Sequence, residues 1–143
     1  EALDPGFAEY SARIVQNAGA LADALAAQGF RLVSGGTDNH LLLVDLRSFD
    51  GDLTGKVAQE VLDLGGVTLN RNTIPDDPRS PFVTSGVRMG VSSVTTQGMG
   101  ADEMAMIADF TARILRQRDD TGAVQAIALE VAELCAKFPP YPD

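Results

Sequence analysis

Arg88 is the side chain whose type and surroundings most directly suggest binding chemistry. It lies in a short apolar run between Val87 and Met89. Strand alternation places Val87 and Met89 on one face and Arg88 on the other, and Gly86 and Gly90 leave room for a ligand to approach the backbone. A guanidinium grips a carboxylate through two parallel hydrogen bonds. The pattern predicts a site for a small anionic ligand; the alternative is an exposed arginine paired with one of the 20 acidic side chains.

The segment before Arg88 is a long irregular loop rich in asparagine and proline. Asn70, Arg71 and Asn72 supply hydrogen-bond donors and acceptors, and prolines at positions 75, 78 and 81 stiffen the path. Irregular loops of about 12 residues inside a compact domain are usually functional, and stiffness lowers the entropy cost of presenting groups to a ligand. The loop is therefore either part of a binding site or a well-ordered surface loop.

The composition excludes several classes of function. The chain has 143 residues, enough for one domain, and its 45% hydrophobic and 22% charged residues exclude disorder. A net charge of −9 argues against a nucleic-acid partner, and no apolar run approaches the ~20 residues of a membrane helix. The single cysteine, Cys135, excludes an internal disulfide and fits a reducing compartment. We therefore expect a cytoplasmic protein.

Several further residues are predicted to be structural. A single histidine leaves no histidine-based zinc site. His40 follows a turn and opens a strand, which favours a hydrogen-bonded structural role. Cys135, in the last helix, is expected to be a small buried side chain. Gly35 and Gly36 are assigned to a turn, because no phosphate-binding lysine motif follows them.

Helices are predicted from capping residues and apolar periodicity. Asp4 and Pro5 begin a long helix that ends before Gly29. Its length of about 36 Å suits an element that reaches between two domains. Its apolar residues recur at steps of three and four, which predicts one buried stripe made of Phe7, Tyr10, Ile14, Ala18, Leu21 and Leu25. Three more helices are predicted over residues 54–64, with Val57, Val61 and Leu64 on one side, 101–117 and 121–136.

Four strands are predicted over residues 30–33, 40–46, 67–70 and 87–91. The second strand does not alternate between apolar and polar residues, which predicts burial on both faces. The element order α-β-β-α-β-β-α-α indicates an α+β fold. We expect a two-layer α/β sandwich in which helices cover a small, mostly antiparallel sheet.

Three segments of the chain resemble the C-terminal region of the serine hydroxymethyltransferase family. They are SGGTDNHLLLVDLR at 34–47, GVTLNRNTIPDDPRSPFVTSGVRMG at 66–90 and TTQGMG at 95–100. The resemblance runs from the first helix to LCAKFPPYP near the end of the sequence. It implies a fold-type I pyridoxal-phosphate enzyme that interconverts serine and glycine and passes a one-carbon unit to tetrahydrofolate. It also implies a homodimer.

The same resemblance implies roles for five residues. Arg88 corresponds to the family's arginine that clamps the carboxylate of the amino-acid substrate. Asn72 corresponds to the asparagine that contacts folate, and Ser80, Pro81 and Phe82 resemble the stretch that lies against the folate ring. A core aromatic that anchors the loop is the alternative for Phe82.

The resemblance implies that pyridoxal phosphate is bound outside this chain. The family holds the cofactor on a lysine in a T-T-H-K context, and neither Lys56 nor Lys137 has that context. We expect residues 1–143 to be one C-terminal small domain, with residues 1–28 leading in as a long helix from an absent large domain. We expect this chain alone to hold no catalytic residue and to be inactive.

Two other functions remain open. The chain could be a stand-alone, non-catalytic module that binds a carboxylate or a folate-like ligand. It could also belong to another fold-type I enzyme, such as an aminotransferase, although that leaves the asparagine- and proline-rich loop unexplained. The first helix distinguishes a domain of a larger enzyme from a stand-alone module, because its apolar stripe needs a partner surface only in the larger enzyme. The chain departs from the family at Gly90–Ser93 and at Gln97, and we expect these changes to alter the loop that leaves the site.

Overall fold

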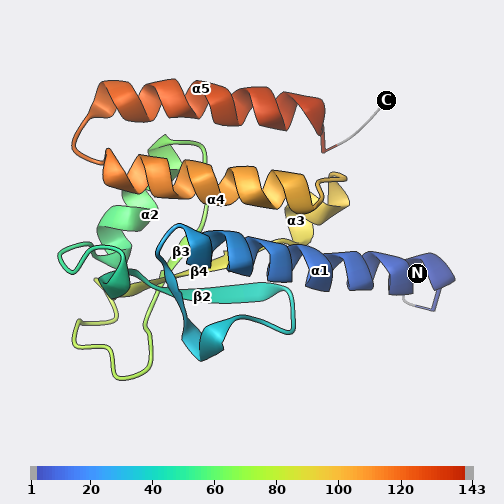
Figure 1. Cartoon of the computed structure of the whole chain (residues 1–143), viewed down its shortest axis with the longest axis horizontal. Coiled ribbons are helices and arrows are strands. Elements are labelled where there is room, and N and C mark those ends of the chain that lie inside the picture. Colours follow the sequence, from blue (N-terminus) through green and yellow to red (C-terminus); the bar gives the residue numbers. More distant parts are fainter. Residues whose placement is uncertain (1–2, 141–143) are drawn as a thin grey trace.

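Five α-helices and four short strands form the fold of residues 3–140, which this computed structural model describes (Figure 1). The strands form an antiparallel sheet in the order β1-β2-β4-β3. The predicted two-layer α+β sandwich is confirmed. The helices are α1 (Pro5–Ala27), α2 (Gly55–Leu64), α3 (Ser92–Thr96), α4 (Ala101–Arg116) and α5 (Thr121–Lys137), and the strands are β1 (Arg31–Leu32), β2 (Leu41–Asp45), β3 (Asn70–Asn72) and β4 (Gly86–Gly90).

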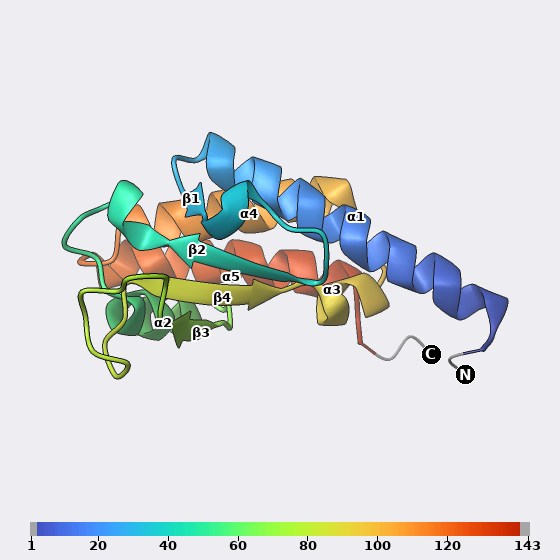
Figure 2. The ribbon, with the colours of Figure 1, turned by 90° about the horizontal axis from the view of Figure 1, so that it is seen from below.

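Helix α1 begins and ends where its capping residues predict. The Asp4 carboxylate accepts a hydrogen bond from the Gly6 amide at 2.8 Å, and Gly29 follows the helix with a φ of +97°. In its second half, Leu21 and Leu25 are buried as predicted. In its first half, Phe7 remains 43% exposed, because this half extends past the end of the sheet (Figure 2).

A buried polar contact attaches α1 to the segment that follows β4. Asn17, only 5% exposed, donates from Nδ2 to Thr95 Oγ1 and to the Met99 carbonyl, each at 2.9 Å. Both donor hydrogens of the amide are thereby satisfied, which removes most of the cost of burying it. Thr95 lies in α3, a short helix that was not predicted.

The sheet packs one face against the helices and leaves the other uncovered. Leu42, Val44, Val87 and Met89 lie on the packed face and are at most 6% exposed. In Figure 2 the sheet stands in front of α4 and α5, with its uncovered face toward the viewer. The prediction that β2 is buried on both faces is wrong, because Leu41 on the second face is 36% exposed.

The third strand lies three residues later than predicted. Residues 67–69 are irregular, and β3 is formed by Asn70–Asn72, of which only Asn70 lies in the predicted strand. Asn70 pairs with Arg88 and Asn72 pairs with Gly86. A polar strand is stable here because it lies at the edge of the sheet, where one face is open to solvent.

Three predicted side-chain environments are also wrong. In α2 the buried side is formed by Ala58, Val61 and Leu62, whereas Val57 is 41% and Leu64 is 72% exposed. Cys135 is exposed rather than buried, although its neighbour Leu134 is only 4% exposed. His40 is also exposed, and within residues 3–140 its ring makes no hydrogen bond; only its carbonyl is used, by the Val91 amide.

Candidate functional site

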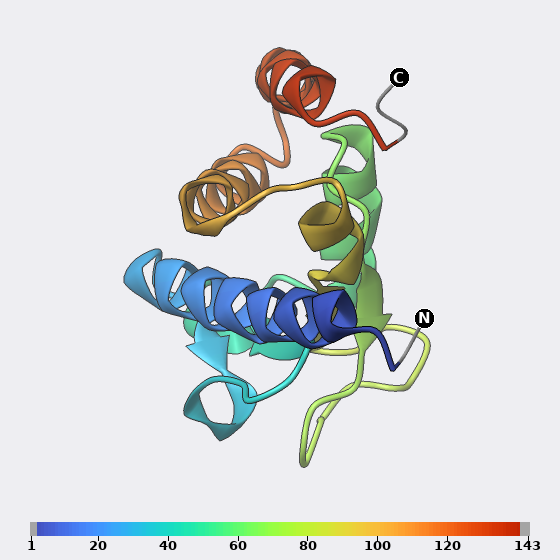
Figure 3. The same ribbon diagram turned by 90° about the vertical axis from the view of Figure 1, so that its right-hand side faces the viewer.

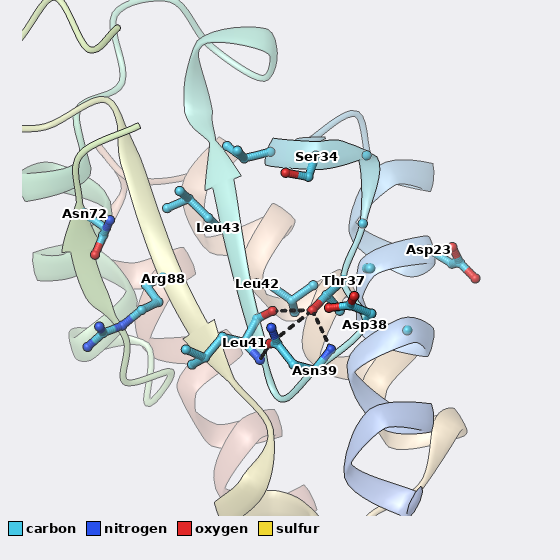
Figure 4. Close-up of a pocket in the computed structure, with 15 residues that line it drawn as sticks. Asp23, Ser34, Thr37, Asp38, Asn39, Leu41, Leu42, Leu43, Asn72 and Arg88 are labelled. Atoms are coloured by element: carbon cyan, nitrogen blue, oxygen red, sulfur yellow. Dashed lines mark hydrogen bonds between the residues drawn. The ribbon is translucent and has the colours of Figure 1, made fainter. Parts of the chain in front are cut away.

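An open pocket of about 820 Å³ lies over the uncovered face of the sheet (Figure 4). Leu41 and Leu43 of β2 form its floor, Arg88 and Asn72 stand on one side, and the loop at residues 33–39 forms the opposite wall. Helix α1 contributes Gly19, Ala22 and Asp23 to its lining. Two residues of the predicted site, Arg88 and Asn72, are therefore brought to one pocket from different strands.

The sheet register fixes the surroundings of Arg88. Leu43 pairs with Arg88 on one side and Asn70 pairs with it on the other. Directly paired residues project to the same face, so an apolar and an amide side chain flank the guanidinium. Along β4, the nearest positions on this face are Gly86 and Gly90, which carry no side chain that could cover it.

Arg88 is exposed, and no acidic side chain among residues 3–140 forms an ion pair or hydrogen bond with it. Two other arginines of the sheet region, Arg47 and Arg31, are paired with an acid. Arg47 holds the buried Asp45 carboxylate at 2.8 Å, and Arg31 lies 3.5 Å from the same carboxylate. The described part of the chain therefore leaves the guanidinium of Arg88 available for an external anion.

Asn72 offers one free polar atom to the pocket. Its Nδ2 donates to the Thr73 carbonyl at 2.8 Å, which fixes the orientation of the side chain. Across residues 3–140 its Oδ1 accepts no hydrogen bond. The amide is half-buried and lines the same pocket as Arg88.

Ser80, Pro81 and Phe82 lie elsewhere, in the turn of the loop between β3 and β4. This loop, residues 73–85, projects from the sheet (Figure 3). All three residues are exposed, and none lines the pocket of Arg88. Phe82 is 78% exposed, so it is not a core aromatic that anchors the loop.

The Asp77 carboxylate organises this loop. Partial burial by itself raises the pKa of Asp77. Hydrogen bonds from the Ser85 hydroxyl and from the amides of Arg79, Ser85 and Ile74 outweigh that effect, and the pKa falls to about 2. Two cationic side chains lie near this carboxylate: the guanidinium of Arg79 donates to the Ser85 hydroxyl, and Arg47 interacts with Asp77 through its charge. The ionised form of Asp77 is thus the one that the folded loop stabilises.

Acidification should therefore weaken the fold through Asp77. The folded pKa of about 2 is below the ordinary value of 3.8, so the contribution to stability is complete above pH ~4 and is lost as the pH falls toward 2. After allowance for partial exposure, we expect the free energy of unfolding to fall by about 1–2 kcal/mol more in the unmodified chain than in Asp77→Asn over this range. Urea unfolding at several pH values measures the difference. If the free energy of unfolding had the same pH dependence in both proteins, the stabilising role assigned to ionised Asp77 would be contradicted.

The pocket wall at residues 33–39 was not assigned to the site from the sequence. Thr37 Oγ1 donates to the Leu41 carbonyl at 2.6 Å, and Asn39 Oδ1 accepts from the Leu41 amide at 2.8 Å. Ser34 has a φ of +64°, an uncommon conformation for a residue other than glycine. The only signal in the sequence was the run of turn formers SGGTDN, which marks a turn but not its position beside Arg88.

Other kinds of site are not formed by the described residues. Lys56 and Lys137 do not line the pocket. Over residues 3–140, no group of three or more histidine, cysteine, aspartate or glutamate side chains could hold a metal ion. No helix in this part of the chain is both long enough and apolar enough to cross a bilayer.

Comparison with protein families gives one finding. Residues 1–111 match the family model described as serine hydroxymethyltransferase. The matched region contains the whole sheet, the loop of residues 33–39, the loop of residues 73–85 and Arg88.

Proposed function

Because the chain belongs to the serine hydroxymethyltransferase family, we propose that it is the amino-acid- and folate-binding C-terminal domain of an enzyme that interconverts serine and glycine. In this proposal a one-carbon unit passes between serine and tetrahydrofolate. The observation that supports it best is the arrangement of Arg88, which is exposed beside Asn72 in the pocket and has no acidic partner within residues 3–140.

Arg88 binds the carboxylate of serine or glycine in this proposal. Its planar guanidinium donates two parallel hydrogen bonds to the two carboxylate oxygens. The apolar side chains of Leu41 and Leu43 beneath the ligand exclude part of the water and strengthen this ion pair. A substrate fixed at its carboxylate keeps one orientation, so the bond to be broken is held in the reactive geometry.

Asn72 and the turn at Ser80, Pro81 and Phe82 bind tetrahydrofolate in this proposal. The free Oδ1 of Asn72 accepts a hydrogen bond from the edge of the pterin ring. The exposed ring of Phe82 offers an aromatic face for the folate. Asn72 therefore belongs to both the amino-acid pocket and the start of the folate-binding loop.

The residues of this chain do not themselves fit pyridoxal phosphate. The cofactor needs a lysine at the site, and both lysines of the chain lie outside the pocket that contains Arg88. We assign the cofactor to a large domain of the same protein, where it supplies the electron sink for the reaction. Within residues 3–140 the chain contributes binding and orientation of the substrates.

A stand-alone binding module is the second candidate, and the exposure of α1 argues against it. Phe7 and Val15, in its first half, are 43% and 42% exposed. Apolar side chains at this spacing normally lie against another surface. We therefore propose that this half of α1 packs against the large domain.

The 143-residue chain is expected to form no Schiff base with pyridoxal phosphate. The protein encoded by the full reading frame should bind the cofactor and convert serine to glycine in the presence of tetrahydrofolate. Absorbance spectra after addition of the cofactor, followed by a glycine assay, measure both properties. A Schiff-base band in the short chain would contradict the assignment to another domain, and a complete protein without this activity would contradict the proposed function.

A further inference from the structure

We propose that Asp77 is a positioning residue that holds the folate-binding loop, residues 73–85, in a fixed place relative to Arg88. This inference rests on the proposed function, because it concerns how the two substrates are placed in one site. Asp77 itself touches neither substrate in this proposal. It acts through the backbone of the loop.

One carboxylate connects the two ends of the loop. Oδ2 accepts from the Ile74 amide at 3.2 Å and from the Ser85 amide at 2.9 Å. Oδ1 accepts from the Ser85 hydroxyl at 2.7 Å and from the Arg79 amide at 3.0 Å. Ile74 follows Asn72 closely, and Ser85 directly precedes the strand that carries Arg88. Asp77 thus connects the backbone that follows Asn72 to the backbone that precedes the strand of Arg88.

Arg79 attaches the same network to a neighbouring turn. Its guanidinium donates to the Gly51 carbonyl at 2.8 Å, to the Leu53 carbonyl at 3.2 Å and to the Ser85 hydroxyl at 3.0 Å. Leu53 is 1% exposed and belongs to the core. The loop is therefore fixed to the body of the domain as well as closed on itself.

The backbone of the loop needs this restraint. Asp76 has a φ of +53° and Thr84 has a φ of +60°. The second value is costly for a β-branched residue. Thr84 is only 1% exposed, and its hydroxyl donates to the Gly86 carbonyl at 3.0 Å. Such conformations persist only where surrounding contacts hold them, and the contacts of Asp77 lie on both sides of them.

Asparagine cannot replace Asp77 in this network. All four donors point at carboxylate oxygens, and in either orientation the NH₂ group of an asparagine would face at least one backbone N–H donor. Asp76→Asn is the matched control, because Asp76 is exposed and asparagine tolerates its positive φ. Ser85→Ala is a milder second variant that removes one of the four hydrogen bonds.

In the complete protein, Asp77→Asn should raise the KM for tetrahydrofolate by about tenfold. Serine affinity and kcat at saturating folate should change by less than about twofold. Ser85→Ala should shift the folate KM in the same direction by a smaller factor, which keeps the test valid if Asp77→Asn does not fold. A folate KM in both variants equal to that of Asp76→Asn would overturn the inference, even if their stability falls.

Amide hydrogen exchange in the 143-residue chain separates this inference from the proposed function. Exchange at Ile74, Arg79 and Ser85 should become faster in Asp77→Asn, while exchange in α4 should not change. Unchanged exchange at these three amides would show that Asp77 does not order the loop. A complete protein that lacks activity with serine and tetrahydrofolate would sink the proposed function alone, because the exchange result does not depend on it.

Discussion

Replacing Arg88 with alanine in the complete protein is expected to weaken serine binding by about 100-fold or more. The change removes two charge-assisted hydrogen bonds, each of which contributes about 1.5–3 kcal/mol. It should leave folding nearly unchanged, since the side chain is exposed and makes no contact with an acid within residues 3–140. Titration of the cofactor absorbance with serine measures the affinity.

Two control variants test whether the loss of serine affinity comes from the guanidinium of Arg88. Arg88→Lys keeps the charge but not the planar fork, so it should recover only part of the affinity. Arg31→Ala removes an arginine from the same sheet that is already 3.5 Å from Asp45, and it should leave serine affinity unchanged. Normal serine affinity in Arg88→Ala would refute the role assigned to Arg88.

Gly86→Ala is expected to lower the free energy of unfolding of the 143-residue chain by about 3 kcal/mol or more. A Cβ at this position would lie 2.8 Å from the Val44 carbonyl oxygen and 2.9 Å from that of Asn72, and it would overlap the Ile74 side chain. The two oxygens belong to the strands on either side of β4. Neither can move without breaking the sheet. Urea unfolding measures the effect.

Gly90→Ala is the matched control for this substitution, because it lies on the same strand and the same face. A Cβ at Gly90 would lie 3.3 Å from Leu41 Cδ2, the end of a flexible side chain. This variant should differ from the unmodified chain by less than about 1 kcal/mol. Similar stabilities for Gly86→Ala and Gly90→Ala would show that the strands do not approach Gly86 as closely as the structure indicates.

Four of the five helices of residues 3–140, all except α3, could be predicted because their signals are local. Asp4 and Pro5 mark the start of α1, and the Asp120 carboxylate accepts from the Ala123 amide at 3.0 Å to cap α5. The apolar stripe of α1 follows from the helical period alone. Its first half is exposed because burial depends on the extent of the rest of the fold, which the period does not specify.

The sheet could be predicted only in part, because its contacts are non-local. Asn70–Asn72 form a strand through pairing with β4, although their residue types favour a loop. Leu41 and Leu43 look like core residues in the sequence, yet they form the pocket floor. Secondary-structure propensity describes each segment alone. Whether a segment forms the edge of a sheet depends on which other strands lie beside it.

For the candidate site, the sequence suggested which side chains bind a ligand but not which of them lie together in the folded structure. Glycine spacing around Arg88 suggested an accessible guanidinium, and family resemblance suggested Asn72. Their meeting in one pocket depends on the antiparallel register of β3 and β4. The opposite wall comes from residues 33–39, which are far away in sequence, so no local pattern could assign them to the site.

The most direct test of the central claim is a crystal structure of the complete protein with pyridoxal phosphate and glycine. The glycine carboxylate should lie against Arg88, with two parallel N–H···O hydrogen bonds of about 2.8 Å. Asn72 should stand at the edge of the same site. A glycine carboxylate held by other residues, with Arg88 directed into solvent or paired with an acidic side chain, would contradict the account.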